Sequence, residues 1–401
     1  MKILIVSQYY FPEQFQINDI APELVRRGHE VTVLCGLPNY PQGRIYPGYA
    51  DVSKRDEVID GVRVIRSRQV PRGRNPLSLA LNYWSFARNA RKIVRELPAD
   101  FDVVIGYQLS PVTSMLPALD YAKRHGTPLL MYCLDLWPVS AQSHLPLKRG
   151  LLYRWLHGLS RKIYRGFDRI AVTSKPFIGY LHEVNGVPED RLFYLPQHAD
   201  PSMLETDLTA EDNGVADFMY AGNLGTGSTL EVIVKAAKVL GPRRDYKIHF
   251  VGDGSRRKAL EALVAEYGLQ DNFIFYGNRK RAEMPAFYRK ADVLLITLRG
   301  NNAVGDTMPG KLQMYMTVGK PILGAINGSA REVIAEAGCG RCVPAGDHVG
   351  LAAAMLAYME HPEDYAACGE RARAYFRREF TFEKYMDGLE AGIHKLTKHA
   401  V

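Results

Sequence analysis

Short apolar runs of strand length alternate with stretches of helix length along this chain, and the alternation occurs in two separate series. The first series opens at residues 2–6 (KILIV) and the second at residues 217–221 (DFMYA). Alternating strands and helices predict parallel sheets joined by right-handed crossovers, with ligands bound beyond the carboxyl ends of the strands. We therefore expect an α/β protein of two Rossmann-like domains that face a central cleft.

Hydrophobic periodicity gives the expected elements of each series. In the first series we expect strands at 3–7, 30–35, 62–67, 103–107, 129–134 and 169–173, and long helices at 17–28, 75–96 and 147–165. In the second we expect strands at 217–221, 246–251, 272–276, 292–297, 321–324 and 340–343, followed by a helical stretch at 347–398. Two prolines among polar residues near 196–201 indicate a linker. The expected domains are residues 1–200 and 201–381, with a last helix at about 382–401 packing back on the first domain.

The positive charge of the chain is concentrated in its first half. Residues 1–205 hold 26 Lys and Arg against 19 Asp and Glu, whereas residues 206–401 hold 25 against 24. A basic surface suits nucleic acid, an anionic membrane or a phosphorylated ligand. Because no zinc-finger, aromatic RNP or helix-turn-helix pattern is present, we expect no nucleic-acid partner.

The sequence lacks the patterns of an exported or disulfide-bonded protein. Its first apolar run is too short for a signal peptide, and no stretch reaches the ~18 apolar residues of a spanning helix, so we expect a cytoplasmic protein. The five cysteines are scattered and odd in number, which argues against a disulfide framework. The single Cys339-x-x-Cys342 pair offers too few ligands for zinc. We expect neither a metal nor a cofactor.

Glycines that follow the first strand of the second series predict a phosphate-binding turn. Gly222-Asn223-Leu224-Gly225 comes directly after this strand, and a helix is expected shortly afterwards. Glycines let backbone N–H groups approach a phosphate, and a helix N-terminus adds partial positive charge. A plain strand-to-helix turn is the alternative. Gly252 begins a glycine pair after the next strand, where either a turn or a ligand contact would explain it.

A second anion-binding pattern lies at residues 306–311. Thr307-Met308-Pro309-Gly310-Lys311 opens an expected helix that runs to Val318. A lysine beside the free amides of a helix start suits a pyrophosphate, and a capped helix with a solvated lysine is the alternative. Asp306, one residue upstream, stands where a hydroxyl-binding carboxylate would stand.

Candidate acceptor-binding residues follow two strands of the first domain. Asp135 and Trp137 come after the strand at 129–134, and a carboxylate beside a tryptophan at such a place is typical of a sugar or acceptor site. An Asp cap for the next helix is the alternative. The turn at residues 8–16 contains Glu13 and Gln14 but no glycine, which argues against a dinucleotide oxidoreductase.

Two stretches of the basic half combine arginines with bulky apolar residues, at 72–88 and at 151–165. Basic amphipathic helices of this kind bind in a membrane interface. Ordinary core-facing helices with a polar outer side are the alternative. Together with the uneven charge, these stretches lead us to expect contact with an anionic membrane surface.

Taken together, these motifs resemble retaining GT-B glycosyltransferases of family 4 over nearly the whole chain. The resemblance runs from Met1-Lys2-Ile3-Leu4 through Gly28-His29-Glu30-Val31 to Gly319-Lys320-Pro321. Within this family, Phe11-Pro12-Glu13 and the segments 135–138, 220–225 and 309–316 look like the WbuB/WcaI type of enzymes, which act in O-antigen and colanic-acid assembly.

The resemblance implies that the second domain binds a nucleotide sugar. The Glu-x7-Glu motif of the family falls on Asp306 and Met314, and its phosphate-binding arginine is replaced by Asn223, so Lys311 would supply the missing positive charge. The expected catalytic residues are Asp135, Lys311 and Asp306. The expected donor contacts are Gly222, Asn223, Leu224, Gly225, Gly252, Gly277, Met284, Thr307, Met308, Pro309, Gly310 and Gln313, and the expected acceptor contacts are Glu13, Gln14 and Trp137.

The activity that the resemblance implies is a retaining, metal-independent transfer of a deoxyhexose or an N-acetylamino hexose. N-acetylfucosamine, carried from UDP to a polyprenyl-diphosphate-linked glycan on the inner face of the cytoplasmic membrane, fits it best. The nucleotide sugar is a substrate, so no cofactor is implied. A GDP-fucose-type fucosyltransferase, a nucleotide-sugar epimerase and a non-catalytic carbohydrate-binding subunit are the alternatives.

Overall fold

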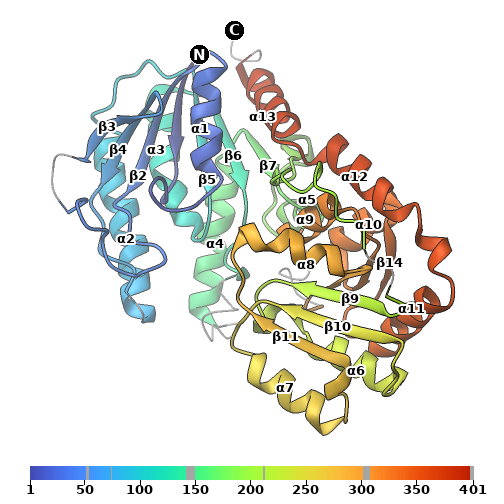
Figure 1. Ribbon diagram of the computed structural model, residues 1–401. Coiled ribbons are helices and arrows are strands. Elements are labelled where there is room, and N and C mark those ends of the chain that lie inside the picture. The colour runs from blue at the N-terminus through green and yellow to red at the C-terminus, as the bar shows by residue number, and fades with distance from the viewer. Residues whose placement is uncertain (51–53, 74, 141–149, 211–212, 301–307, 398–401) are drawn as a thin grey trace. The chain divides into compact units, whose positions relative to one another are not determined.

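The computed structural model describes residues 1–50, 54–73, 75–140, 150–210, 213–300 and 308–397 (Figure 1). Contacts between residues divide the chain into two compact units. The first unit comprises Met1–Leu195 together with the chain from Met386 onward, and the second comprises Pro196–Tyr385. The sequence had suggested a division after residue 200.

The first unit is built on an eight-stranded sheet in the order β3-β4-β2-β1-β5-β6-β7-β8. Its strands are β1 (Lys2–Val6), β2 (Glu30–Gly36), β3 (Asp56–Ile59), β4 (Val62–Ser67), β5 (Val103–Gln108), β6 (Leu129–Cys133), β7 (Arg169–Val172) and β8 (Leu192–Tyr194). All neighbours pair in parallel except β3 with β4. Residues 3–6 of β1 are fully buried, because a central strand of a parallel sheet is covered on both faces.

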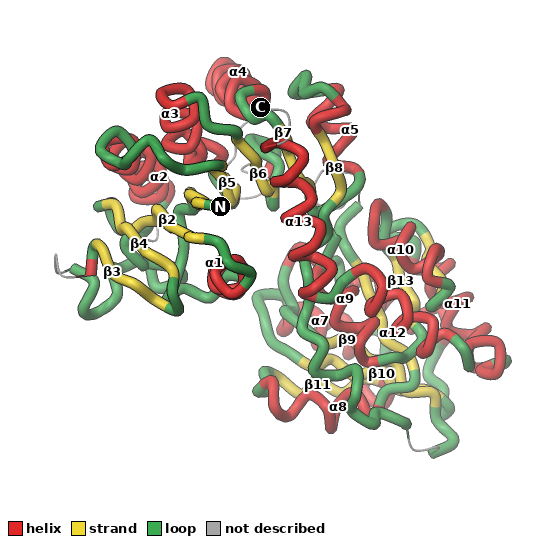
Figure 2. The backbone as a smooth tube through the Cα atoms, turned by 90° about the horizontal axis from the view of Figure 1, so that it is seen from above, coloured by secondary structure: helices red, strands yellow, loops and turns green. Residues whose placement is uncertain are grey.

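Helices cover both faces of this sheet (Figure 2). α2 (Pro76–Ile93), α3 (Leu116–His125) and α4 (Leu151–Arg165) lie on one face, and α1 (Ile17–Arg26) lies on the other. The short 3-10 turn η2 (Val112–Met115) precedes α3 and contacts both α2 and α4. α5 (Pro176–Glu183) connects β7 to β8.

The second unit is built on a six-stranded parallel sheet in the order β11-β10-β9-β12-β13-β14. Its strands are β9 (Ala216–Ala221), β10 (Tyr246–Val251), β11 (Phe273–Gly277), β12 (Val293–Thr297), β13 (Ile322–Ala325) and β14 (Gly340–Val343). Its helices are α6 (Glu231–Leu240), α7 (Arg257–Glu266), α8 (Met284–Lys290), α9 (Gly310–Val318), α10 (Gly328–Ala337), α11 (His348–Glu360) and α12 (Cys368–Glu379). The strand order reverses between β9 and β12, so a ligand crevice is expected outside the carboxyl ends of these two strands.

These elements confirm the predicted α/β class and all the predicted strands, and they add two strands that were not predicted. β3 alternates exposed and half-buried residues at the sheet edge, and β8 has only three residues, so neither forms a recognisable apolar run. The helical stretch expected at 347–398 is three helices, separated by a 3-10 turn at Pro362–Tyr365 and by Phe380. The helix expected at 147–165 begins at Leu151, and its first residues, 147–149, lie outside the described residues.

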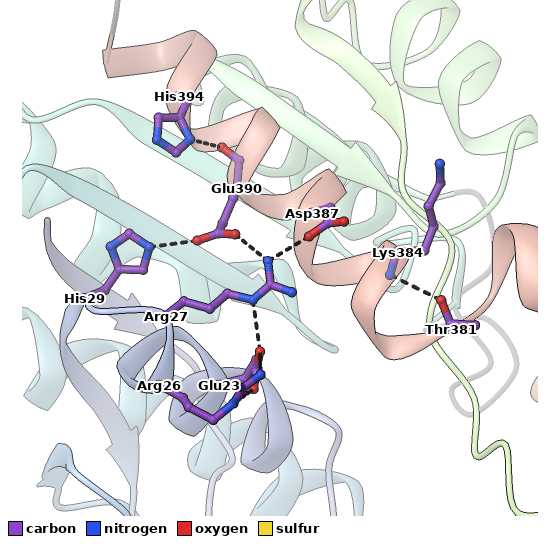
Figure 3. A network of polar contacts seen from close by, with 9 residues as sticks. All are labelled: Glu23, Arg26, Arg27, His29, Thr381, Lys384, Asp387, Glu390 and His394. Carbon is purple, nitrogen blue, oxygen red and sulfur yellow. Dashed lines mark hydrogen bonds and ion pairs between the residues drawn. The ribbon is translucent and has the colours of Figure 1, made fainter.

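The last helix, α13 (Phe382–Thr397), is joined by ion pairs to the turn between α1 and β2 of the first unit (Figure 3). Arg27 Nη1 lies 2.8 Å from Asp387 Oδ1 and 2.6 Å from Glu390 Oε2. His29 Nε2 lies 2.9 Å from Glu390 Oε1, and Glu23 holds Arg27 from within α1 at 2.9 Å. Burial alone would raise the pKa of Glu390, but hydrogen bonds from His29 and Arg27 outweigh burial and lower that pKa. These charges fix the second half of α13 to the first unit.

Candidate functional site

Two glycine turns meet at the carboxyl edge of the second unit's sheet. Gly222 follows β9 with a φ of 142°, and Gly252 follows β10 with a φ of 137°, a region that residues with a side chain rarely adopt. A Cβ on Gly252 would lie 2.0 Å from the Gly222 carbonyl oxygen. Hydrogen bonds from Gly222 N to Val251 O (2.8 Å) and from Leu224 N to Asp253 O (2.9 Å) hold the turns together. The edge therefore exposes backbone where other residues would place side chains.

Lys311 places its ammonium against the first of these turns. It is the second residue of α9, and its Nζ lies 3.2 Å from the centroid of the Tyr220 ring. A Cβ on Gly222 would lie 2.7 Å from the same nitrogen, so the ammonium occupies the space that a side chain would need there. Burial lowers the pKa of Lys311 to about 7, because a desolvated ammonium favours its neutral form.

No carboxylate in the described part of the chain offsets the charge of Lys311. Burial is the one influence on its pKa that these residues exert, so none of their Asp or Glu side chains is close enough to pair with it. The face of the Tyr220 ring provides partial compensation. A buried cation without a counter-charge is costly, and an anionic ligand would remove that cost.

The start of α9 adds backbone donors beside this lysine. Pro309 precedes the helix with φ −76° and ψ 129°, and no described side chain caps the first amides. Gly310, the first helical residue, is exposed. Unpaired amides and the partial positive charge of a helix N-terminus bind anions. Together with the glycine turn and Lys311, this arrangement suits a diphosphate.

Several other predicted donor contacts lie at the same edge. Asn223 is exposed and Gly225 is half-buried. Gly277 ends β11 with a φ of 73°, and its carbonyl accepts a hydrogen bond from Gly252 N at 2.9 Å. Leu224 is fully buried in the hydrophobic core, so only its backbone is available to a ligand.

The remaining predicted donor contacts point into the second unit or lie outside the described residues. Met284 and Met308 pack against its hydrophobic core. Gln313 is 2% exposed, and its Nε2 donates to the Gln197 carbonyl. Contact of these three side chains with a donor stays a prediction. Asp306 and Thr307 lie outside the described residues.

Two tyrosines that no sequence pattern indicated shape the glycine turn, and a threonine with a left-handed backbone follows it. The Tyr220 hydroxyl donates to the Asn223 carbonyl at 3.1 Å, and the Tyr315 hydroxyl accepts from Ala221 N at 2.8 Å. Both tyrosines are buried, so in the sequence they look like ordinary core residues. Thr229 has a φ of 44°, a left-handed conformation that costs a β-branched residue about 1–3 kcal/mol. No sequence pattern indicates it.

Asp135 lies at the carboxyl edge of the first unit's sheet, just after β6. Its carbonyl accepts from the Tyr164 hydroxyl at 3.3 Å, and the same hydroxyl accepts from Trp137 N at 3.1 Å. Trp137 is 9% exposed and belongs to the packing. Burial raises the pKa of Tyr83. The positive charge of Arg72 opposes this rise, and the negative charge of Asp135 adds to it. Arg72 and Asp135 are therefore each close enough to Tyr83 to act on it electrostatically.

Glu13 is buried beneath the loop that follows β2. Its Oε1 accepts from Asn39 N and from Tyr40 N, each at 2.7 Å. Burial raises the pKa of Glu13 to about 7, although these hydrogen bonds act to lower it. Gln14 is exposed and donates to the Pro12 carbonyl at 3.4 Å. Glu13 thus supports the loop, and contact of Glu13, Gln14 or Trp137 with an acceptor stays a prediction.

The described residues show no membrane-crossing helix and no metal cluster. Within those ranges, every helix is too short or too polar to cross a membrane. The same residues contain no group of three His, Cys, Asp or Glu side chains that could hold a metal ion. Cys339 and Cys342 are free thiols, and burial raises the pKa of each to about 12.

The chain is similar to known glycosyltransferases in sequence and in fold. Residues 14–198 match the family model described as glycosyl transferase 4-like domain, and residues 208–375 match the one described as glycosyl transferases group 1. The WcaI protein of Escherichia coli (strain K12), assigned to colanic acid biosynthesis as a glycosyl transferase, is 27% identical over 344 residues, which are 80% of this chain and 82% of that protein. The 2-deoxystreptamine glucosyltransferase of Streptomyces kanamyceticus is 28% identical over 331 residues, covering 77% and 79%.

A solved structure supports the same fold. Alr3699/HepE of Anabaena, crystallised in complex with UDP, aligns over 99% of this chain and 100% of its own, with a TM-score of 0.71 at 15% identity. Together with the two parallel-sheet units, this likeness confirms the predicted GT-B fold. The chain is therefore a glycosyltransferase in which a glycosyl transferase 4-like domain is followed by a group 1 glycosyl transferase domain.

Proposed function

We propose that this chain is a retaining enzyme that transfers a hexosyl group from a UDP-sugar to a lipid-linked glycan during surface polysaccharide biosynthesis. The observation that carries the proposal is Lys311, a buried ammonium without a described counter-charge that packs against Gly222. A diphosphate would bring negative charge to the place where this ammonium, the glycine turn and the start of α9 converge.

For the donor we favour N-acetylfucosamine carried by UDP. HepE of Anabaena, which shares the fold, was crystallised with UDP and also with UDP-glucose. The similarity to WcaI supports a role in surface polysaccharide assembly, and the resemblance of the motifs to O-antigen enzymes supports an N-acetylamino deoxyhexose. GDP-fucose is the alternative donor, because it presents the same diphosphate to the same groups.

The leaving group sets most of the catalytic demand in this proposal. When the bond between the anomeric carbon and the phosphate oxygen breaks, negative charge grows on the diphosphate and positive charge on the anomeric carbon. Amides near Gly222 and Gly310, together with protonated Lys311, stabilise the leaving diphosphate without a divalent cation. Preorganised donors of this kind contribute roughly 3–4 kcal/mol each. Asp306, one residue before the segment at 307–311, is proposed to hold a sugar hydroxyl.

The acceptor is proposed to use the carboxyl edge of the first unit. Its hydroxyl forms the new bond on the same face of the sugar that the diphosphate leaves, so the anomeric configuration is retained. Asp135 positions this hydroxyl and takes its proton. The acceptor is a glycan on polyprenyl diphosphate, which brings the chain to the inner face of the cytoplasmic membrane. The excess of cations in the first half of the chain supports this location.

Thermal unfolding with UDP, GDP and ADP tests the proposed function. At about 100-fold above its dissociation constant, a bound nucleotide adds about 2.7 kcal/mol to the free energy of unfolding. We expect UDP to stabilise the wild-type protein, Lys311→Met to lose most of this effect, and Lys235→Gln to keep it, since Lys235 is an exposed lysine of the same unit. Stronger stabilisation by GDP would favour the fucosyltransferase alternative. A wild-type protein that no nucleotide stabilises would contradict the proposal.

A further inference from the structure

Helices α2 and α4 both begin at the carboxyl edge of the first unit's sheet, because each follows a parallel strand of that sheet, β4 and β6 respectively. They lie on the same face of the sheet (Figures 1 and 2), and η2 contacts both of them. Neither helix contains an Asp or a Glu, whereas α2 carries three Lys or Arg and α4 carries four. The two helices therefore form a cationic pair.

Along α2 the exposed side chains change from apolar to basic. Leu77, Leu81 and Trp84 are between 41% and 71% exposed. Arg88 and Lys92 continue the same stripe, because residues three or four positions apart share one face of a helix. At ~1.5 Å per residue, the apolar part of the stripe is about 10 Å long. The cations follow it directly, on the side away from the carboxyl edge.

Helix α4 repeats this order. Leu151 and Trp155, at its start, are 84% and 64% exposed. Arg161 and Lys162 follow at exposed positions in its second half. Arg154 is the one cation of the first turn, and its long side chain can extend away from an apolar surface. Both helices thus present apolar residues at the carboxyl edge of the sheet and cations behind them.

A groove of about 300 Å³ lies beside the cations of α2. It is lined by Trp84, Arg88, Lys92 and Arg95, and by Leu116 at the start of α3. The Arg88 guanidinium lies 5.0 Å from the centroid of the Trp84 ring. The groove therefore combines a positively charged wall with an apolar one.

Three of the four cations at this groove form no ion pair with any residue that the structure describes. Arg91, the fourth, lies 2.6 Å from Asp120, whereas Arg88, Lys92 and Arg95 have no such ion pair. A phosphodiester group fits this setting, because its oxygens would meet the cations while the carbons next to it meet Trp84.

We infer that α2 and α4 dock end-on into an anionic phospholipid bilayer, with their apolar first turns in the acyl boundary and a headgroup phosphate in the groove of Arg88, Lys92 and Arg95. Interfacial segments enter a bilayer by about 5–10 Å, which matches the apolar length of α2. The inference rests on the proposed function, whose lipid-linked acceptor brings the chain to a membrane. End-on docking would also turn the sheet edge that carries Asp135 toward the lipid.

Flotation of the full chain with vesicles of phosphatidylcholine and phosphatidylglycerol tests the role of the charges. Arg88→Gln/Lys92→Gln should weaken vesicle binding about 30-fold, since each cation near an anionic surface contributes about 1 kcal/mol. Lys123→Gln/Arg124→Gln is the matched control, because it removes two exposed cations from the end of α3, at the opposite edge of the same sheet. It should leave binding close to wild type. Equal losses in the two variants, or no loss in the first, would overturn the inference.

Depth-dependent fluorescence quenching tests the orientation. Trp84 and Trp155 are exposed, and Trp137, the third tryptophan, is 9% exposed. Lipids with a nitroxide on the acyl chain should quench Trp84 in the Trp155→Phe variant and Trp155 in the Trp84→Phe variant. Trp137, measured in the double variant, should not respond. Vesicle binding without quenching of Trp84 and Trp155, or burial of both in a dimer formed without vesicles, would overturn end-on docking.

Nucleotide binding, measured on the same proteins, separates this inference from the proposed function. Arg88→Gln/Lys92→Gln should keep the stabilisation by UDP, because both positions lie outside the second unit. If the wild-type protein binds vesicles as expected but binds no nucleotide, the proposed donor site fails and the docking surface stands. If it binds UDP but not anionic vesicles, the docking surface fails alone.

Discussion

The two sheets of this chain present different chemistry at their carboxyl edges. The second unit presents backbone, since Gly222 and Gly252 place no side chain over the turns and Lys311 is the cation beside them. The edge of the first unit is built from side chains, such as buried Gln8, whose Nε2 donates to Asn82 Oδ1 at 2.9 Å. The diphosphate is the same in UDP-, GDP- and ADP-sugars, so backbone groups and one cation suffice to bind it, whereas the proposed acceptor glycan has to be distinguished by side chains.

Each edge also holds a group whose pKa burial shifts to about neutral pH, and the two groups have opposite sign. Burial raises the pKa of Glu13 to about 7 and lowers the pKa of Lys311 to about 7. The contribution of Glu13 to the free energy of unfolding is fully present below its ordinary pKa of 4.5. It is lost as the pH rises through the folded-state pKa of about 7. The contribution of Lys311 to the free energy of unfolding is fully present above its ordinary pKa of 10.5. It is lost as the pH falls through the folded-state pKa of about 7. Near neutral pH both groups are therefore poised to exchange protons.

The largest expected effect separates acceptor chemistry from donor binding. Asp135→Asn keeps the shape of the side chain but removes the proposed proton acceptor, so sugar transfer should fall by about 10²–10⁴-fold. The stabilisation by UDP should not change, because Asp135 belongs to the first unit. Asp190→Asn, an exposed position at the opposite edge of the same sheet, is the control for charge. Transfer at the wild-type rate by Asp135→Asn would remove Asp135 from the mechanism.

A smaller effect is expected from filling the place where the two glycine turns meet. Gly252→Ala combines a strained φ with a Cβ 2.0 Å from the Gly222 oxygen, and it should lower the free energy of unfolding by about 3 kcal/mol. Gly179→Ala, in helix α5 with nothing within 4 Å of the added Cβ, should instead raise it by up to about 1 kcal/mol. Urea denaturation measures both. Similar stabilities of the two variants would mean that the turns are not locked together.

The smallest effect concerns the buried carboxyl of the first unit. Glu13→Gln can still accept the hydrogen bonds from Asn39 and Tyr40, and it has no charge to desolvate. It should be more stable than the wild type by on the order of 2 kcal/mol above pH 7, and the difference should vanish below about pH 4. Denaturation curves across this pH range test it. A difference that does not depend on pH would show that Glu13 is not protonated by burial.

Much of the fold could be predicted from the sequence because buried parallel strands are continuous apolar runs. The edge strands β3 and β8 escaped prediction, since one is half-exposed and the other has three residues. Helix boundaries also shifted. A helix was expected shortly after Gly225, but residues 226–228 form a 3-10 turn and α6 begins at Glu231.

The candidate site could be predicted only where glycine or a helix start marks it. Gly222 and Lys311 were predicted from such patterns, and the structure brings them together. Tyr220 and Tyr315 were missed, because a buried tyrosine in a strand or helix is indistinguishable in sequence from any other core residue. Gln313 was predicted to contact the donor, but its side chain is buried and donates to the Gln197 carbonyl. These two residues are far apart in the sequence, so no local pattern indicates this hydrogen bond.

Proton uptake during UDP binding is the most direct test of the central claim, that a buried lysine and backbone amides hold a diphosphate. At about pH 8.5, free Lys311 is mostly neutral, since its pKa is about 7, and a nucleotide phosphate is already fully ionised. Calorimetry in two buffers of different ionisation enthalpy should show nearly one proton taken up per UDP by the wild-type protein and none by Lys311→Met. Binding without proton uptake, or equal uptake by both proteins, would contradict the account.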